Sequence, residues 1–444
     1  MIRSLDLVDV GPSPHLHLDL GSRFNVMTGD NGLGKSFVLD VIWWALSGTW
    51  AGPQAWPREG AATPKIEVML DKSIAAKGGL KETYVSSFDV RRQEWNPRSF
   101  DAVRSPLPAL VFYARADGGF AVWDPVRNHF SFRPGSRMAI SDSEVQADPA
   151  TIRRPPAYLL TFDEALNEKK LAGKTICNGL ISDWVSWQLM RPETPSGQAF
   201  QRLCAMLETL SPNPENDREL IRPGAPRRVF VDDSRMFPTI NMGYGDVPII
   251  HASAGMRRIV SLAYMIVWTW HEHLEASRLL HQAPADSFVF LMDEVETHLH
   301  PEWQRRIVPA ILTVLEALSP SMKVQLHLTT HAPLVLASLE TRFDPDQDKL
   351  FVFDLESGAV VLDEIPWARR GDASRWLTSP AFNLHRARSI EAERAIDDAN
   401  AFMRGEEPKH HKTHEAIERA LSSALSDQDP FWPRWLTFKG DTAA

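Results

Sequence analysis

Cysteine is scarce in this sequence: only Cys177 and Cys204 occur among 444 residues. Two cysteines are too few for a disulfide scaffold or a four-cysteine zinc site, so we interpret both as buried thiols. Long apolar runs are missing as well, because no segment approaches the roughly 18 apolar residues of a membrane span. The opening stretch MIRSLDLVDVG lacks the apolar core of a signal peptide. We therefore expect a cytoplasmic protein with no membrane partner.

Positive charge is in deficit: 48 Lys and Arg stand against 57 Asp and Glu, for a net charge of -9. This balance argues against a protein that coats nucleic acid through overall basicity. Local basic clusters, APRRV and HRAR, leave DNA as a candidate partner, although isolated surface arginines are the commoner explanation. Internal repeats and low-complexity tracts are also absent, which excludes solenoids and disordered scaffolds. The hydrophobic content of 43% is ample for a core of two or three domains or one elaborated domain.

Strand and helix patterns divide the chain into five segments. Residues 1–50 read as strands, a turn and a helix, and an α/β pattern resumes over 227–365, with strands expected at RVFVDD, SFVFLMDE, VQLHLTTH, KLFVFDL and AVVLDEI. Residues 51–156 contain short β-rich runs broken by Pro and Gly, which predict an inserted β-rich lobe. Residues 157–226 show the apolar spacing of a helical lobe. Residues 366–444 are expected to form a helical C-terminal tail.

The stretch GDNGLGKS, Gly29 to Ser36, fits the phosphate-loop pattern and lies between the apolar strand FNVM and a helix. Its glycines let successive backbone N–H groups and the helix N-terminus point at phosphates. Lys35 is expected to reach the β- and γ-phosphates of ATP, and Ser36 to ligate Mg²⁺. The residues expected to bind the nucleotide are Gly29, Asp30, Asn31, Gly32, Gly34, Lys35, Ser36 and Phe37.

Two later strands end on residues suited to nucleotide hydrolysis. Asp293 and Glu294 follow the run SFVFLM, where the first carboxylate would join the Mg²⁺ shell and the second would accept a proton from the attacking water. His331 ends the run LHLTTH, where a histidine can hydrogen-bond a γ-phosphate. The histidines of ETHLH and KHHKTH lack the ligand spacing of a zinc site, so we interpret both as polar loops.

The order of GDNGLGKS, ASAGM, FVFLMDE, ETHLHP and TTHAP resembles the ABC-type ATPase heads of the SMC, RecF and RecN kind. It is most similar to the overcoming-lysogenization-defect (OLD) class and the AAA-labelled ATPases of bacterial anti-phage systems, including Septu-type and retron-associated ATPases. DEVETHLHP carries most of this resemblance; Val295 stands where that class has proline. The resemblance implies an α/β P-loop NTPase with an ABC-ATPase head and a mixed sheet. Asp293 then matches the magnesium aspartate, Glu294 the catalytic glutamate and His331 the switch histidine.

The resemblance also implies a head-to-tail homodimer, or a higher homo-oligomer, in which a signature motif completes the ATP site of another subunit. Ser253 and Gly255 match the serine and second glycine of that signature, whereas Ala254 and Met256 depart from its first glycine and its glutamine. Ser253 is by local rules the N-cap of a helix. The glutamine that the family carries on a loop has only Gln93 as a candidate.

Three hypotheses on function follow. The first is an ATPase that regulates a separately encoded effector of the HNH, Toprim or toxin kind in anti-phage defence, since the chain shows no nuclease domain of its own. The second is a RecF-like repair ATPase acting directly on DNA. The third, a transporter subunit, is disfavoured because DEVETHLHP is not the transporter pattern. Neither predicted lobe shows the sustained heptads of SMC and RecN coiled coils.

Overall fold

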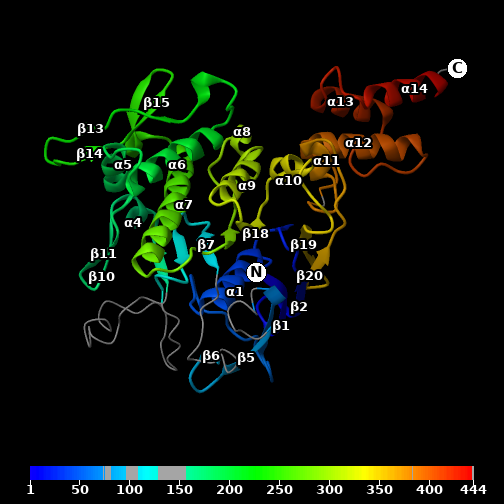
Figure 1. Ribbon diagram of the computed structural model, residues 1–444. Coiled ribbons are helices and arrows are strands. Elements are labelled where there is room, and N and C mark those ends of the chain that lie inside the picture. The colour runs from blue at the N-terminus through cyan, green and yellow to red at the C-terminus, as the bar shows by residue number, and fades with distance from the viewer. Residues whose placement is uncertain (74, 76–81, 97–108, 129–156, 383, 443–444) are drawn as a thin grey trace. The chain divides into compact units, whose positions relative to one another are not determined.

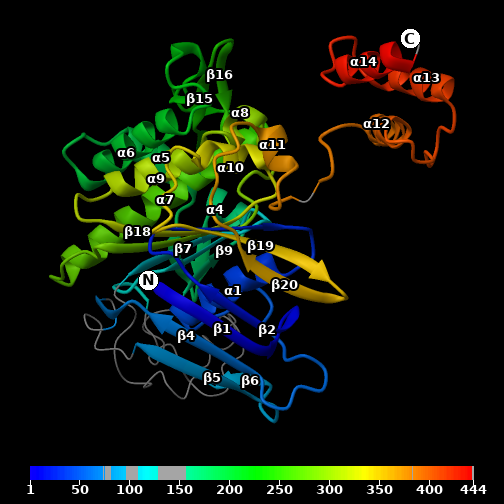
Figure 2. The same cartoon turned by 90° about the vertical axis from the view of Figure 1, so that its right-hand side faces the viewer.

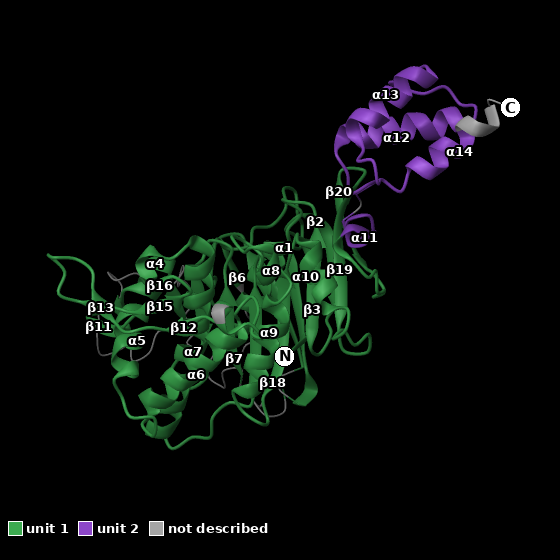
Figure 3. Ribbon diagram, turned by 90° about the horizontal axis from the view of Figure 1, so that it is seen from above, with its two compact units in different colours: residues 1–373 green, residues 374–444 purple. Residues whose placement is uncertain are grey.

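The computed structural model describes residues 1–73, 75, 82–96, 109–128, 157–382 and 384–442. The chain divides into two compact units, Met1–Ala373 and Ser374–Ala444 (Figure 3). Within the described part of the chain, no helix combines the length and apolar character needed to cross a membrane. The first unit contains the sheets and every residue of the predicted nucleotide site.

An eight-stranded mixed sheet forms the centre of the first unit (Figure 1). In spatial order its strands are β20 (Ala359–Glu364), β19 (Lys349–Glu356), β3 (Phe24–Gly29), β18 (Lys323–Thr329), β17 (Ser287–Met292), β7 (Leu110–Ala114), β8 (Phe120–Trp123) and β9 (Tyr158–Leu160). The run from β19 to β7 is parallel, whereas β20, β8 and β9 pair antiparallel. The carboxyl ends of β3, β18, β17 and β7 therefore meet at one edge of the sheet, where ligands bind in open α/β sheets.

A second, antiparallel sheet lies on the other side of α1 (Lys35–Ser47), so that α1 is enclosed between the two sheets (Figure 2). Its strands in order are β2 (Ser13–Asp19), β1 (Ile2–Val10), β4 (Lys65–Leu70), β5 (Thr83–Asp89) and β6 (Glu94–Asn96). The sequence of α1 is apolar on nearly all sides, and Trp43 and Trp44 belong to one core cluster with residues of both sheets. An apolar helix of this kind is stable only when it is surrounded.

The predicted β-rich lobe over 51–156 does not form a separate unit. β4, β5 and β6 extend the sheet of β1 and β2, whereas β7 and β8 join the central sheet beside β17. Alternating polarity identifies a short strand but does not reveal its partner, which is why the sequence suggested an insertion. The parts 97–108 and 129–156 of that lobe lie outside the described residues.

Helices cover the rest of the first unit. The helices are α4 (Phe162–Leu166), α5 (Leu180–Gln188), α6 (Pro195–Thr209), α7 (Ala254–Leu279), α8 (Pro301–Gln304), α9 (Ile307–Ala317) and α10 (Pro333–Leu339). Short strands accompany them: β10 (Lys169–Leu171), β11 (Lys174–Cys177), β12 (Arg222–Pro223), β13 (Arg227–Arg228), β14 (Met236–Phe237), β15 (Thr239–Met242) and β16 (Gly245–Pro248). The strand expected at RVFVDD is wrong, because β13 ends at Arg228 and residues 229–233 form a loop.

The second unit has its own core. Its helices are α12 (Ile390–Met403), α13 (His414–Ala424) and α14 (Trp432–Thr442), preceded by α11 (Ala373–Leu377), which begins at the unit boundary. Ile396, Ile417 and Trp435 are buried together between the three helices. The buried carboxylate of Asp398 accepts the backbone N–H groups of Lys409, His410 and His411 in the KHHK loop, and the ring Nδ1 of His411 lies 2.8 Å from it. These contacts give the histidine-rich loop a structural role.

One buried histidine of the central sheet is expected to make the fold sensitive to acid. His327 of β18 is fully buried, and neither ring nitrogen has a hydrogen-bond partner among the described residues. Burial lowers the pKa of His327 from 6.5 to about 3. A proton therefore binds the unfolded chain more tightly than the folded one, so this residue's contribution to stability is intact above pH 6.5 and is lost as the pH falls towards 3.

We expect His327→Met to weaken this acid sensitivity, because methionine fills similar space and does not titrate. Between pH 7 and pH 4.5 the wild type should lose about 2–3 kcal/mol of unfolding free energy that the variant keeps. Denaturant titrations at the two pH values measure the difference. Equal losses in both proteins would show that His327 does not set the acid response.

Candidate functional site

The phosphate loop connects β3 to α1 and depends on glycine at two close contacts. Gly29 has φ +128°, and a Cβ there would lie 2.1 Å from the carbonyl oxygen of Phe353 on the neighbouring strand β19. Gly34, at φ +97°, caps α1 and would place a Cβ 2.5 Å from Pro12. Any other residue type would be strained at these positive φ values and would clash with Phe353 or Pro12. The loop therefore has the tight curl that lets backbone N–H groups face an anion.

Lys35 holds its ammonium group against the inside of this loop. Its Nζ donates to the carbonyl oxygens of Gly29 at 3.0 Å and Asp30 at 2.6 Å. Burial lowers the pKa of Lys35, and the nearby carboxylates of Asp293 and Glu294 oppose that shift. The result is a buried cation between the loop and the carboxylates.

Asp293 follows β17 and joins three neighbouring strand ends. Its Oδ1 accepts the hydroxyl of Ser36 at 3.0 Å and that of Thr329 at 2.7 Å. Burial raises the pKa of Asp293, and these two hydroxyl donors lower it. The oxygen set of Ser36 and Asp293 suits Mg²⁺, which prefers a hydroxyl, one or two carboxylates and phosphate oxygens.

Glu294 has a left-handed backbone conformation with φ 48°. A non-glycine residue in this region costs on the order of 1–3 kcal/mol and persists only where its surroundings fix it. Its N–H donates to Thr329 Oγ1 at 2.8 Å, and its carboxylate accepts the Thr297 hydroxyl at 3.0 Å. Strain of this kind is typical of functional sites.

The segment after β18 is held by Glu296. Its Oε2 accepts the Thr330 hydroxyl at 2.8 Å, and its Oε1 accepts the backbone N–H of His331. Burial, and then the charge of Lys35, lower the pKa of His331, so its ring is biased towards the neutral form. A neutral imidazole can donate or accept a hydrogen bond at this position.

Lys35, Asp293, Glu294 and His331 line one cavity of about 220 Å³. Its lining residues are Asn31, Gly32, Gly34, Lys35, Ser36, Phe37, Asp293, Glu294, Thr329 and His331. Residues that are about 300 positions apart in the chain thus share one space. Gly29 and Asp30 contribute through their carbonyl contacts with Lys35. Gln93 lies in the turn between β5 and β6 and does not line the cavity.

The predicted signature does not line this cavity either. Ser253 is the N-cap of α7, accepting the N–H of Met256 at 3.3 Å, and both Ser253 and Ala254 are exposed. Gly255 is buried, and a Cβ there would lie 2.5 Å from the carbonyl oxygen of His298. The first turn of α7 therefore packs against the loop after Glu294 and leaves its N-terminus open.

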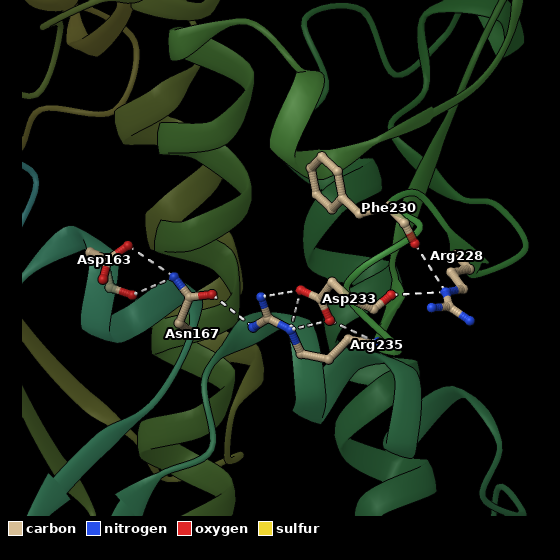
Figure 4. Close-up of polar contacts among 6 residues, drawn as sticks. All are labelled: Asp163, Asn167, Arg228, Phe230, Asp233 and Arg235. Carbon is tan, nitrogen blue, oxygen red and sulfur yellow. Dashed lines mark hydrogen bonds and ion pairs between the residues drawn. The ribbon is translucent and has the colours of Figure 1, made fainter.

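Residues 229–235 form a loop with an exposed apolar tip, and this loop lies close to the predicted signature. Figure 4 shows its polar contacts, made by Asp163, Asn167, Arg228, Phe230, Asp233 and Arg235. Arg228 donates to the carbonyl oxygens of Phe230 at 3.0 Å and Asp233 at 2.9 Å. The Phe230 ring lies 6.4 Å from that of His251, just before the signature, and Val231 is 96% exposed. The hydrogen bonds from Arg228 thus stabilise a loop at residues 229–233, where the sequence predicted a strand.

Comparison with known proteins gives one family match and two similar solved structures. Residues 185–337 match the profile of an AAA domain family whose description names the AbiEii toxin and a Type IV TA system. The match includes the signature, both carboxylates and His331. Two solved structures are similar to this chain: the SMC head domain from Thermotoga maritima, with 14% identity and a TM-score of 0.37, and the SmcHead bound to the C-winged helix domain of ScpA, with 13% identity and a TM-score of 0.40. Each alignment covers 82% of this chain and 98% of the other.

The strand order, the phosphate loop after β3 and the carboxylates after β17 define an α/β P-loop fold with a mixed sheet. The expected α/β fold with a mixed sheet is confirmed. Thr329 and Glu296 had not been identified from sequence as site residues. Thr329 lies within the run LHLTTH, two residues before His331, but its role arises from contacts with Asp293 and Glu294 after β17.

We expect Thr329→Val to weaken Mg-ATP binding about tenfold and to reduce stability by about 1–3 kcal/mol, because the isosteric side chain leaves the Glu294 N–H unpaired and removes a donor from Asp293. Calorimetric titration and thermal unfolding measure the two effects. Thr329→Ser, which keeps the hydroxyl, is the matched control and should remain close to the wild type. Wild-type affinity in Thr329→Val would contradict this role.

Proposed function

We propose that this chain binds ATP with Mg²⁺ and hydrolyses it to ADP and phosphate. The observation that carries the proposal is the single cavity that joins the phosphate loop, Asp293, Glu294 and His331. In this arrangement a cation, a magnesium ligand pair and a candidate base face the same space. Such groups act together only when they are brought within reach of one substrate.

Each group then has a defined task. Lys35 binds the terminal phosphates, and Ser36 and Asp293 would hold Mg²⁺, which neutralises charge on the phosphate oxygens when bound. Glu294 accepts the proton of the attacking water, and the Thr297 hydroxyl orients its carboxylate. His331 donates a hydrogen bond to the γ-phosphate from its position in the cavity wall.

The exposed N-terminus of α7 supports ATP-dependent dimerisation. Ser253 lies outside its own cavity, and the start of a long helix offers free N–H groups and a positive dipole end to a phosphate. The apolar tip of loop 229–235 lies close to this N-terminus, because the Phe230 ring is near that of His251. Phe230 is 42% exposed and Val231 is 96% exposed. We infer a head-to-tail homodimer in which Ser253 and Gly255 complete the nucleotide site of the other subunit.

The dimer is proposed to regulate a separately encoded effector of bacterial anti-phage defence. The order of motifs and the matching family, whose description names a toxin and a TA system, support this assignment. An HNH, Toprim or toxin-like protein is the class of partner that it requires. Co-expression with the neighbouring genes, followed by identification of the co-eluting chain, tests this part of the proposal.

Direct action on DNA gains less support. Of the HRAR cluster, Arg386 pairs with Asp397 at 2.9 Å and Arg388 pairs with Asp429. Arg228 of the APRRV cluster is used by the carbonyl groups of its own loop. Guanidinium groups already held by carboxylates or carbonyls have fewer donors free for phosphates.

We expect Glu294→Gln to bind ATP while its hydrolysis falls at least about a hundredfold, because an amide cannot accept the proton of water. The variant should accumulate as a dimer in Mg-ATP, detected by light scattering after gel filtration. Adding Ser253→Arg should abolish that dimer but leave binding at the phosphate loop intact. Hydrolysis at the wild-type rate by Glu294→Gln would exclude Glu294 as the base, and a dimer that survives Ser253→Arg would exclude the signature contact.

A further inference from the structure

Arg258 lies one turn into α7, beyond the signature, and its guanidinium group contacts two loops at the edge of the central sheet. Its Nη1 donates to the carbonyl oxygen of Ala116 at 3.2 Å, and its Nη2 donates to that of Glu294 at 3.4 Å. Ala116 follows β7, and Glu294 follows β17. Because β7 and β17 are parallel neighbours, with Ala114 opposite Met292, one side chain spans the ends of both strands.

Arg258 donates its hydrogen bond to the carbonyl oxygen of Glu294, a residue whose backbone is strained. At φ 48° Glu294 needs its neighbours to fix it. Its N–H is held by the Thr329 hydroxyl at 2.8 Å. Its carbonyl accepts the Thr297 N–H at 3.0 Å and the guanidinium of Arg258. Both polar ends of this backbone residue are therefore held, and one of them is held by α7.

Charge reinforces the contact. The half-buried guanidinium interacts electrostatically with the three carboxylates of the segment after β17, which belong to Asp293, Glu294 and Glu296. An arginine remains protonated at such a position, and its planar fork reaches two acceptors at once. Lysine would supply the same charge from a single point and could not span Ala116 and Glu294 in the same way.

A second contact ties the same turn of α7 to the same loop. The backbone at Gly255 approaches the carbonyl oxygen of His298 so closely that a Cβ would lie 2.5 Å away. The beginning of α7 thus meets the loop of residues 294–298 at its start, through Arg258, and near its end, through Gly255. These two contacts connect the start of α7 to the loop that carries Glu294.

We propose that Arg258 is a positioning residue that fixes Glu294 for hydrolysis in its own subunit and thereby links the signature helix to that subunit's own site. The inference rests on the proposed function, since it assigns Arg258 a task in ATP hydrolysis. In the proposed dimer, Ser253 serves the nucleotide of the other subunit, whereas Arg258, one helical turn away, serves the base of its own. The helix α7 therefore connects the two sites of the dimer.

Arg258→Met tests the positioning role. We expect kcat for ATP hydrolysis to fall about tenfold to a hundredfold, because a displaced base loses its alignment, while the ATP affinity stays within about twofold of the wild type. Arg258→Lys should recover only part of the rate. Arg278→Met, at the exposed far end of the same helix, is the control and should keep the wild-type rate. A wild-type kcat in Arg258→Met, or an equal loss of ATP affinity and rate in both Arg258 variants, would overturn the proposal.

Mixed subunits show in which subunit Arg258 acts. A Lys35→Ala subunit mixed with a Ser253→Arg subunit forms one composite site, in which the Ser253→Arg subunit supplies the phosphate loop and Glu294. Adding Arg258→Met to that subunit should lower hydrolysis about tenfold or more, whereas adding it to the Lys35→Ala subunit should change the rate less than twofold. The reverse pattern would show that Arg258 acts through the signature and not through Glu294.

These experiments separate the inference from the function on which it rests. If the wild type does not hydrolyse ATP, the proposed function fails. If the wild type hydrolyses ATP and Arg258→Met does so equally well, only the role of Arg258 fails. An inactive reference mixture of Lys35→Ala and Ser253→Arg counts against completion by the other subunit, and the comparison of wild type with Arg258→Met then decides the inference.

Discussion

The site depends on one buried oxygen atom, Oδ1 of Asp293. It accepts the hydroxyl groups of Ser36, at the start of α1, and of Thr329, at the end of β18. A buried carboxylate is unfavourable unless hydrogen bonds compensate for the lost water. Here one donor lies at the start of the helix after β3, and the other lies at the end of the neighbouring strand β18. The charge that suits Asp293 to Mg²⁺ is therefore stabilised by the same contacts that fix the phosphate loop next to it.

The parallel register of the central sheet makes that contact possible. β3, β18 and β17 are consecutive neighbours, so Lys35, His331 and Glu294 leave the sheet at the same edge. The enclosed helix α1 keeps the phosphate loop in place, because its apolar surface is satisfied only between the two sheets. From this fixed centre, the loop after Glu294 extends to α7, where Gly255 and Arg258 meet it. The phosphate loop, the proposed base and the start of α7 thus form one connected set of contacts.

The sequence predicted the parts of the site that depend on local rules. The glycines at 29 and 34 require φ > 0 and close packing, and the strands ending before Asp293 and His331 are short apolar runs with clear limits. These features need no knowledge of distant residues. The structure accordingly has β3, α1, β17 and β18 where the patterns indicated.

Other features depend on partners that are far away in the chain, and the sequence did not reveal them. β7 reads like any short strand, and only its pairing with β17 shows that its end borders the site. Residues 229–233 alternate like a strand, but Arg228 binds their carbonyl groups and forms a loop. Thr329, Glu296 and Arg258 are common residue types whose tasks arise only from contacts across several elements. Gln93 had the expected residue type but not the expected place.

The most direct test of the account is phosphate release by the purified chain in ATP with Mg²⁺, measured beside Lys35→Ala. The central claim is that the phosphate loop and the carboxylates after β17 form one hydrolytic site. The account predicts steady release by the wild type that requires Mg²⁺, and no release above background by Lys35→Ala. Absence of release by the wild type, or equal release by both proteins, would contradict it.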